Sequence, residues 1–464
     1  MVHASIQVLV AAAALLCYSP VGAFHVQVQS RTSRSSGRDI SRDGHRFRCS
    51  STPSALGAKG DDGGGEGGYD KDARVIVVGG SGRVGGSTVR ALRQLAGPGL
   101  ELLVGGRSQR NFVKSVERWR TLPGGGEGYD YSDVKFVELD LGDAASLASA
   151  LDGCDLVVHT AGPFQRKTRP EVVPAAVSTP LVPYVDVCDD ARLAMVAKAL
   201  NEKSQEAGVS ATISAGIWPG IDQLMAVEAC EMLGGASEVE SIDFSAYTAG
   251  TGNAGTTILS ATFLILCEKV LGFKDGNEIF HEPASGFKKV DFGQSIGEKT
   301  VFRMNLIESF TCNQVLGIPN ISTYFGTSPE PWNYLLKGMT LLPNSIMGNR
   351  DLMQALAEFS EPLVRITDKL VGATNAMRLE AVAKDGRKAV LNYAHEDLEV
   401  CVGIATAAFV VATLRGDVRP GVWFPEEAFD DEAKRGRLFN DATRGAFMWE
   451  RQEQGATAVE GAPL

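Results

Sequence analysis

Short apolar runs alternate with helical patterns along residues 74–214, and this rhythm predicts the first domain. The run at 75–78 contains no polar residue, which is typical of a strand buried on both faces of a parallel sheet. Further strands are expected at residues 100–104, 134–139, 155–159, 184–187 and 210–214. Strands that alternate with helices in this way predict an α/β fold with a doubly wound parallel sheet and right-handed crossovers.

The pattern changes after residue 216. Strands are expected at 239–247, 288–292, 300–306, 377–383 and 389–394, and helices at 221–233, 331–342 and 352–370. This irregular mixture predicts a second, α+β domain at 216–396, which we assign to substrate binding. Residues 400–414 are apolar on almost every side, which is typical of a buried helix, and the run is too short to span a membrane.

A glycine motif follows the first strand, because Gly80, Gly82 and Gly85 match G-x-G-x-x-G. In this motif one glycine allows a tight turn, one lets the backbone approach a pyrophosphate, and one lets the helix pack closely on the strand. The phosphates would bind N–H groups at the helix N-terminus, although a plain turn is the alternative in a chain with 52 glycines. The residues predicted to bind the dinucleotide here are Gly79, Gly80, Ser81, Gly82, Arg83, Val84 and Gly85.

The residues after the second strand indicate which dinucleotide would bind. An NAD-binding unit carries Asp or Glu there to bind the ribose hydroxyls, whereas this chain has Arg107 and Ser108. The Arg107 guanidinium can bind a 2′-phosphate, with Ser108 as a second donor, which predicts NADP(H) as the cofactor. The alternative is a solvated arginine beside a serine that only caps the next helix. Asp140, after the third strand, either faces the edge of the adenine ring or belongs to a turn.

Composition limits the classes of function. The 464 residues are too many for one ordinary core and favour two domains after a leader. The formal net charge is −11 and the folded part contains no basic stripe, so we expect no nucleic-acid partner. The eight cysteines form no C-x-x-C pair and have no histidine spacing for zinc, which predicts reduced core cysteines and no metal site.

Residues 1–72 are predicted to be a targeting presequence and a linker. Residues 1–23 have the pattern of a secretory signal peptide, and residues 24–60 are rich in Arg and Ser and poor in acids, as transit peptides are. This order resembles the two-part presequences of algae with secondary plastids, so we expect plastid (chloroplast) localisation, with secretion as the alternative. Residues 61–72 are predicted to be a flexible glycine-rich linker, and residues 429–464 a polar tail.

Candidate catalytic residues lie where strands of the first domain end, since ligands of an open α/β sheet bind at the carboxyl ends of its strands. His159 ends the fourth strand and has a pKa range suited to proton transfer, with a hydrogen-bonded histidine in the turn as the alternative. Asp186 ends the fifth strand and is the second candidate. Ala161, Gly162 and Pro163 are expected to shape a nicotinamide pocket.

Three further features have both a binding and a structural interpretation. Asp189 and Asp190 are expected to cap a helix rather than to react. Trp218 either stacks on a ligand or packs at the domain junction. The glycines of the loop at 249–255 precede a helix and either bind a substrate anion or form a plain loop.

Several motifs taken together resemble saccharopine dehydrogenase-like oxidoreductases. They are residues 79–85 (GGSGRVG), 158–164 (VHTAGPF), 184–186 (YVD), 217–220 (IWPG), 249–257 and 421–425 (GVWFP). The similarity covers about residues 73–428 and is greatest to the plant plastid branch of that family. It implies an NADP-binding Rossmann domain at 73–215, a second domain with a mixed sheet, and a helix within 397–428 that returns to the first domain.

The residues and the resemblance together predict an NADP(H)-dependent oxidoreductase that acts on an unidentified small metabolite by hydride transfer. The sequence shows no cluster of arginines that would bind the carboxylates of saccharopine. The alternative is a catalytically inactive NADP(H)-binding sensor or scaffold protein. We expect a small-molecule substrate, no nucleic acid and no membrane span, and a homodimer is compatible with the sequence.

Overall fold

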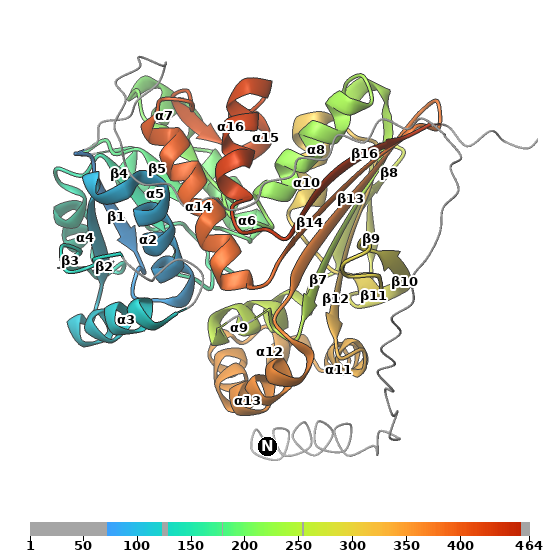
Figure 1. Cartoon of the computed structure of the whole chain (residues 1–464), viewed down its shortest axis with the longest axis horizontal. Coiled ribbons are helices and arrows are strands. Elements are labelled where there is room, and N and C mark those ends of the chain that lie inside the picture. The colour runs from blue at the N-terminus through green and yellow to red at the C-terminus, as the bar shows by residue number, and fades with distance from the viewer. Residues whose placement is uncertain (1–71, 123–128, 179, 253–254, 456–464) are drawn as a thin grey trace, which may run out of the picture. The chain divides into compact units, whose positions relative to one another are not determined.

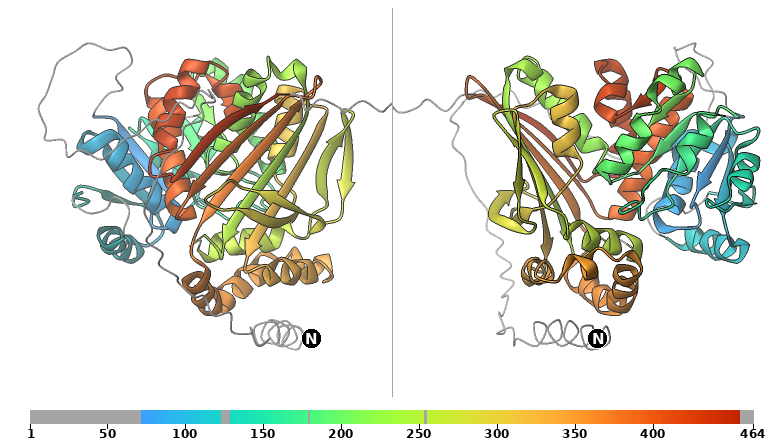
Figure 2. Two further views of the ribbon diagram at one scale, coloured as in Figure 1. Left: turned by 45° about the vertical axis from the view of Figure 1, so that its right-hand side comes forward. Right: turned by 180° about the vertical axis from the view of Figure 1, so that it is seen from behind.

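The computed structural model of the protein describes residues 72–122, 129–178, 180–252 and 255–455, drawn in Figures 1 and 2. The predicted signal peptide, transit peptide and most of the linker fall on residues 1–71, which lie outside the described residues. The targeting assignment therefore stays a prediction.

Within the described residues, seven parallel strands form one sheet in the order β15-β6-β5-β4-β1-β2-β3 (Figure 1). The strands are β1 (Arg74–Val78), β2 (Glu101–Gly106), β3 (Lys135–Glu138), β4 (Leu156–His159), β5 (Tyr184–Asp186), β6 (Ser210–Thr212) and β15 (Gly421–Trp423). Its helices are α2 (Arg83–Ala96), α3 (Gln109–Thr121), α4 (Ala144–Leu151), α5 (Val172–Ala176), α6 (Ala191–Lys198) and α7 (Asn201–Glu206). The strand order reverses between β1 and β4, so a ligand crevice is expected at the carboxyl ends of these strands. The predicted doubly wound α/β fold is confirmed.

Alternate residues of β1 pack against opposite layers of helices. Val75 and Val77 belong to a core shared with α2 and with α14 (Leu398–Leu414), whereas Ile76 and Val78 pack with side chains of α4 and α5. All four side chains are at most 2% exposed. Burial on both faces explains why this strand is an unbroken apolar run.

The second sheet is mixed, as expected. Its described strands run in the order β10-β11-β12-β7-β13-β14-β16, and β8 pairs with β12 and β9. They are β7 (Val239–Ala249), β8 (Val270–Lys274), β9 (Asn277–His281), β10 (Ser285–Asp291), β11 (Glu298–Arg303), β12 (Asn320–Ser328), β13 (Asn375–Ala383), β14 (Lys388–His395) and β16 (Met448–Gln454). Strands β7 and β12 are parallel, and the other neighbouring pairs along this order are antiparallel. Figure 2 shows these long strands side by side.

Helices pack on this sheet and at one end of it. They are α8 (Ile221–Met232), α9 (Thr256–Ile265), α10 (Glu308–Leu316), α11 (Pro331–Met339), α12 (Asn344–Met347), α13 (Arg350–Val371) and α15 (Pro425–Ala428). Helix α8 lies against β13 and β14, and α9 lies against α13 near the end of β7 (Figure 1). The N-terminus of α9 is therefore held on the side of the sheet where β7 ends.

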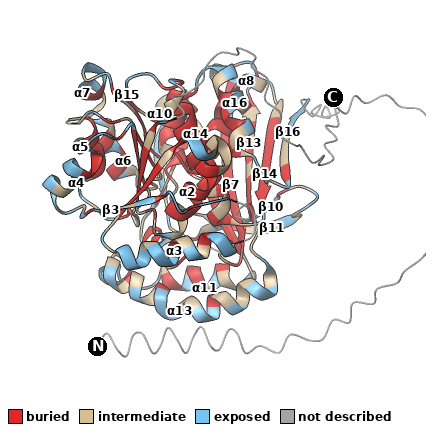
Figure 3. Ribbon diagram, turned by 60° about the vertical axis from the view of Figure 1, so that its left-hand side comes forward, coloured by how far each residue is buried: buried red, intermediate tan, exposed pale blue. Residues whose placement is uncertain are grey.

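Helix α14 leads from β14 back to the first domain and packs along α2, and Figure 3 shows both helices buried there. Gly403 allows this contact, because a Cβ at Gly403 would lie 2.5 Å from the backbone carbonyl carbon of Ser87. Every residue from Gly403 to Thr413 is buried, which accounts for a helix that is apolar on almost every side. Among the described residues, no helix is long and apolar enough to cross a membrane.

Residues 429–454, expected to be a polar tail, are instead part of the fold. Helix α16 (Glu432–Ala442) carries the fully buried Arg435, which forms ion pairs with Glu228 and Glu231 of α8. Strand β16 then pairs with β14 along its whole length. Polar composition alone is misleading here, because two carboxylates compensate the buried guanidinium and the strand is held by backbone hydrogen bonds.

Gly403→Ala is predicted to destabilise the protein, because the new methyl group would overlap the Ser87 backbone. Overpacking of this kind lowers the free energy of unfolding by about 1–3 kcal/mol. Gly436→Ala is the matched control, at an exposed position of α16 with open space around it, and should raise that free energy by about 0.5–1 kcal/mol. Denaturant unfolding measures both changes, and shifts of the same sign would contradict the tight contact at Gly403.

Candidate functional site

A cavity of about 500 Å³ lies at the carboxyl ends of β1, β4 and β5. The first domain lines it with the glycine loop after β1 and with the turns after β4 and β5. The second domain contributes residues along the length of α9, the first residue of α10 and the segment before α8. The cavity thus occupies the crevice expected from the strand order, with walls from both domains.

The glycine loop makes a tight turn through its own backbone. Gly82 N donates to Gly79 O (2.8 Å), and Gly79 has a φ of 82°, which favours glycine. A Cβ at Gly85 would lie 2.5 Å from Gly79 O, so a larger residue would displace the turn. Helix α2 begins at Arg83 with no side-chain cap, which leaves its first N–H groups for a ligand.

The Ser81 hydroxyl shows that this loop fits a phosphate. It lies on the cavity wall, is buried, and has no hydrogen-bond partner among the described residues. A buried hydroxyl without a partner is destabilising, and a phosphate oxygen would accept its hydrogen bond. The loop therefore fits the pyrophosphate of a dinucleotide.

Two arginines at this part of the cavity share one carboxylate. Arg83 Nη1 lies 3.5 Å from Glu399 Oε2, and Arg118 Nη2 lies 3.1 Å from Glu399 Oε1. Burial raises the pKa of Glu399, while the two arginines lower it. Arg83 also lies 3.7 Å from Glu361 of α13. The guanidinium groups place positive charge beside the glycine loop, where an anionic ligand would be stabilised.

Most of the residues predicted to bind the cofactor line the cavity, namely Gly79, Ser81, Gly82, Arg83, Val84, Gly85, Ala161, Gly162 and Pro163. Gly80 does not, because it is buried beneath the loop. Ser108 is the N-cap of α3, and its hydroxyl accepts a backbone hydrogen bond of 3.3 Å. Asp140 is exposed and accepts a backbone hydrogen bond in the turn before α4. Arg107 is exposed at the carboxyl end of β2, and its contact with a 2′-phosphate stays a prediction.

The turn after β4 is fixed from two sides. Thr160 Oγ1 donates to Val78 O (2.9 Å), and Arg350 of α13 donates to Pro163 O (2.9 Å). Gln165 follows this turn, is only 2% exposed and lines the cavity. Its amide interacts with the carboxyl group of Asp189, which follows β5, so the turns after β4 and β5 are joined at the cavity wall.

His159 and Asp186 do not line the cavity but belong to a buried hydrogen-bonded chain. Tyr184 OH donates to Asp186 Oδ2 (2.7 Å), so His159 Nδ1, which lies 3.2 Å from the same hydroxyl, must donate to it. Burial lowers the pKa of His159 to about 3, and burial raises the pKa of Asp186. Asp186 Oδ1 also accepts from the backbone N–H groups of Cys188 and Ser214. The chain joins the ends of β4, β5 and β6, and proton transfer by either predicted residue stays a prediction.

The second domain supplies an apolar wall. Trp218, Met304 and Leu306 line the cavity. Trp218 also packs at the junction, since its Nε1 donates to Asn375 Oδ1 (3.1 Å) and its ring lies 5.9 Å from that of Phe325. The two interpretations of Trp218 are therefore compatible, because this residue packs at the junction and also lines the cavity.

The glycine loop before α9 is tied to α13. The backbone N–H and the hydroxyl of Thr251 each donate to Asp368 over 2.8 Å. Gly255 is the N-cap of α9 and, of the three glycines of this loop, the one that lines the cavity. A Cβ at Gly255 would lie 2.5 Å from Arg83 Cδ, so the start of α9 adjoins the arginines. Residues 253–254 lie outside the described residues.

Two carboxyl groups without a predicted catalytic role also line the cavity. Asp189 was expected to cap a helix, but Asp190 is the cap of α6, and Asp189 faces the cavity. Burial raises the pKa of Asp189 to about 7, a hydrogen bond with Gln165 opposes this rise, and the charges of Asp190 and Glu308 add to it. Glu308, the first residue of α10, is fully buried, and its carboxyl group interacts with that of Asp222. Among the described residues, no group of His, Cys, Asp and Glu side chains is arranged to hold a metal ion.

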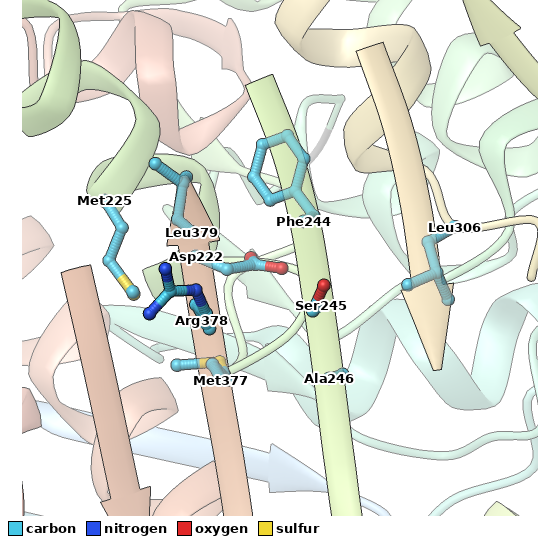
Figure 4. A pocket seen from close by; sticks show the side chains of 9 residues that line it. All are labelled: Asp222, Met225, Phe244, Ser245, Ala246, Leu306, Met377, Arg378 and Leu379. Atoms are coloured by element: carbon cyan, nitrogen blue, oxygen red, sulfur yellow. The ribbon is translucent and has the colours of Figure 1, made fainter. Parts of the chain in front are cut away.

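Behind Glu308 lies Asp222, in the first turn of α8. Burial raises the pKa of both carboxyl groups, and the Glu308 charge raises that of Asp222 further, so the pair is expected to share a proton. Asp222 lines a very small space of about 10 Å³, enough for one water molecule. Figure 4 shows Asp222 among the other side chains that line this space. Burial raises the pKa of a third carboxyl, Glu426 of α15, to about 7.

Residues 75–212 match the Saccharopine dehydrogenase NADP binding domain family. The matched segment contains the glycine loop and the turns after β4 and β5 that line the cavity. This match supports NADP(H) as the cofactor. No curated protein sequence matches the chain.

The structure is similar to that of apo saccharopine dehydrogenase (L-Glu forming) from Saccharomyces cerevisiae, with a TM-score of 0.55 and 14% sequence identity over 82% of this chain and 100% of that chain. This likeness shows a shared fold. Pen from Bacillus thuringiensis is 17% identical over 31% of this chain and 51% of its own, with a TM-score of 0.24. AtPrR2 with NADP+ and (+)pinoresinol is 20% identical over 31% of this chain and 49% of its own, with a TM-score of 0.22. These two scores do not establish a shared overall fold.

Tyr184→Phe is predicted to lower the free energy of unfolding by about 1–3 kcal/mol, because it leaves buried polar atoms of His159 and Asp186 without a partner. Tyr334→Phe is the control, since Tyr334 is 56% exposed, and should change little. Denaturant unfolding measures both variants. A Tyr184→Phe protein of normal stability that binds NADPH but has lost turnover would contradict a purely structural role for this chain.

Proposed function

We propose that this protein is an NADP(H)-dependent oxidoreductase of the saccharopine dehydrogenase-like family, which acts on a small metabolite by hydride transfer. One observation carries the proposal. The cavity is lined on one side by the predicted dinucleotide-binding residues and on the other by apolar and acidic side chains that a nucleotide site alone does not need. A pocket with these two walls can hold a cofactor and a second molecule together.

Most of the residues named here would bind the cofactor, and one of them, Asp189, would transfer a proton. Ser81, the first turn of α2, Arg83 and Arg118 would bind the phosphates of the cofactor. Bound NADP(H) supplies or accepts the hydride. The apolar wall keeps water from the reacting carbon. Asp189, whose pKa burial raises to about 7, can release or take up the substrate's proton near neutral pH.

A second candidate function is an NADP(H)-binding sensor or scaffold without catalysis. The position of His159 and Asp186 favours it, because these two residues serve a buried hydrogen-bonded chain rather than the cavity. Such a protein would bind the cofactor through the same loop but would not need a proton-exchanging group.

Turnover distinguishes the two candidates. Oxidation of NADPH, followed at the nicotinamide absorbance with a panel of carbonyl and imine compounds, should proceed with at least one of them. Asp189→Asn should then lower kcat by about 10²- to 10⁴-fold and leave the Kd for NADPH unchanged, because it removes the proton and not the phosphate contacts. Tight NADPH binding without turnover of any compound would favour the sensor or scaffold.

Arg107→Ala is predicted to weaken NADPH binding by at least about tenfold and to leave NADH binding unchanged, because the guanidinium would contact only the 2′-phosphate. Arg110→Ala is the matched control, at an exposed position three residues further along, and should change neither affinity. Fluorescence titration with both dinucleotides measures this. Equal weakening of NADPH and NADH binding by Arg107→Ala would contradict the phosphate contact.

A further inference from the structure

Helix α13 has a row of apolar side chains on its outer side. Four of them are large and between 40% and 81% exposed, namely Phe359, Leu363, Ile366 and Leu370. With the exposed Ala355 they follow one another at intervals of four, four, three and four residues, which places all five on one face of the helix. We call these five residues the outer stripe of α13. Figure 3 shows α13 at the edge of the molecule, with exposed residues along its length.

The outer stripe is not needed to hold α13 on the rest of the protein. The buried residues on the opposite side of this helix are Met353, Ala357 and Val364. Polar contacts also fix the helix to the cavity wall, because Arg350 donates to Pro163 O (2.9 Å) and Asp368 accepts two hydrogen bonds from Thr251. Single apolar side chains are common on protein surfaces, whereas a continuous row on a helix that is already packed is typical of an interaction surface.

A second copy of this chain fits the outer stripe. In an antiparallel pair of α13 helices related by a two-fold axis beside Leu363, Phe359 of each copy lies opposite Ile366 of the other. The small Ala355 then lies opposite the large Leu370, so that each bulky end has room. The stripe is therefore complementary to itself, as an interface formed by the same surface of both copies must be.

The charges beside the stripe favour the same arrangement. Glu358 and Lys369 are exposed and eleven residues apart, which is about three helical turns, so they lie on the same flank of the stripe. The two-fold axis brings equal flanks of the two helices together. Glu358 of each copy thereby lies close to Lys369 of the other, and two pairs of opposite charge form at the rim of the contact.

We propose that the outer stripe of α13 binds the outer stripe of a second copy, so that the protein forms an antiparallel homodimer. This inference is independent of the proposed oxidoreductase function. A membrane surface fits less well, because Asp351 and Glu358 outnumber Lys369 beside the stripe and the formal net charge of the chain is −11. The 22 residues of α13 span about 33 Å, which is short for a permanent interface, so the dimer is expected to dissociate on dilution.

The mass of the full-length protein tests the pairing. Sedimentation velocity between about 1 μM and about 200 μM protein, the range of weak interfaces, should show the mass rising from that of one chain to that of two. Phe359→Glu and Ile366→Glu should each raise the dimer Kd at least about tenfold, because each would bury a carboxylate without a partner. Phe280→Glu is the matched control, at a phenylalanine of β9 that is 59% exposed, and should leave the Kd unchanged.

Cysteine substitutions test the register of the two helices. Leu363→Cys lies beside the two-fold axis and should form a disulfide-linked dimer under mild oxidation. Ala355→Cys and Leu370→Cys should each fail to do so alone, because equal positions lie about 22 Å apart along the helix axis, whereas the double variant should be linked. The unmodified protein, oxidised in the same way, is the control for the native thiols.

Charge reversal tests the rim of the contact. Glu358→Lys and Lys369→Glu should each raise the dimer Kd about three- to tenfold, and the double variant should restore it. If a glutamate variant of the stripe fails to fold, the dilution series of the unmodified protein and the disulfide of Leu363→Cys still decide the question.

Several results would overturn the inference. They are a monomer throughout the dilution series, a dimer that the stripe variants leave unchanged, and a disulfide-linked dimer formed by Leu370→Cys alone. A monomer that sediments with vesicles of phosphatidylcholine and phosphatidylglycerol only when the stripe is intact would assign the stripe to a membrane instead. A monomer in which the thiol of Leu363→Cys resists alkylation would assign it to another segment of the same chain.

Discussion

The tight packing of α14 on α2 is the interaction on which the rest of the site depends. Gly403 lets the two helices approach closely, and the contact carries the chain from the mixed sheet back to the parallel one. The first turn of α14 thereby brings Glu399 to Arg83 and Arg118, and its first backbone N–H donates to Gly252 O over 2.8 Å. The first turn of α14 therefore contacts two parts of the cavity wall. Glu399 holds the arginines beside the glycine loop of the first domain, and Leu398 holds the loop before α9 in the second domain.

The charge difference along the cavity follows from the order of the strands. The segments after β2 and β1 carry arginines, and the segments after β4 and β5 carry Gln165 and Asp189, so polarity changes from one side of the crevice to the other. Burial raises the pKa of Asp189 and Glu308, which favours their protonated forms, so these carboxyl groups can donate as well as accept hydrogen bonds. A ligand with an anionic part and a hydrogen-bond-donating part therefore has one favourable orientation in the cavity.

The glycine loop was predictable because its signal is local, a fixed spacing of Gly80, Gly82 and Gly85 between a strand and a helix. The buried strands were also predictable from a local signal, because each is a short run of apolar residues. For His159 the sequence left two interpretations open, a catalytic residue and a hydrogen-bonded histidine. The structure places it on the face of β4 that it shares with Val157 and that packs on α4 and α5, because side chains of a strand alternate. That Asp189 and Glu308 line one cavity was not predictable, since these residues are far apart in the sequence and meet only through tertiary packing. Glu308 has no sequence signal that separates it from an ordinary first-turn acid.

The most direct test of this account is a crystal structure of the protein grown with NADP+. The account predicts that the pyrophosphate lies within hydrogen-bonding distance of the Ser81 hydroxyl and the first turn of α2, and that the rest of the cofactor extends along the cavity from the arginines toward Asp189. Cofactor bound elsewhere on the protein, or a cavity still empty at saturating NADP+, would contradict it.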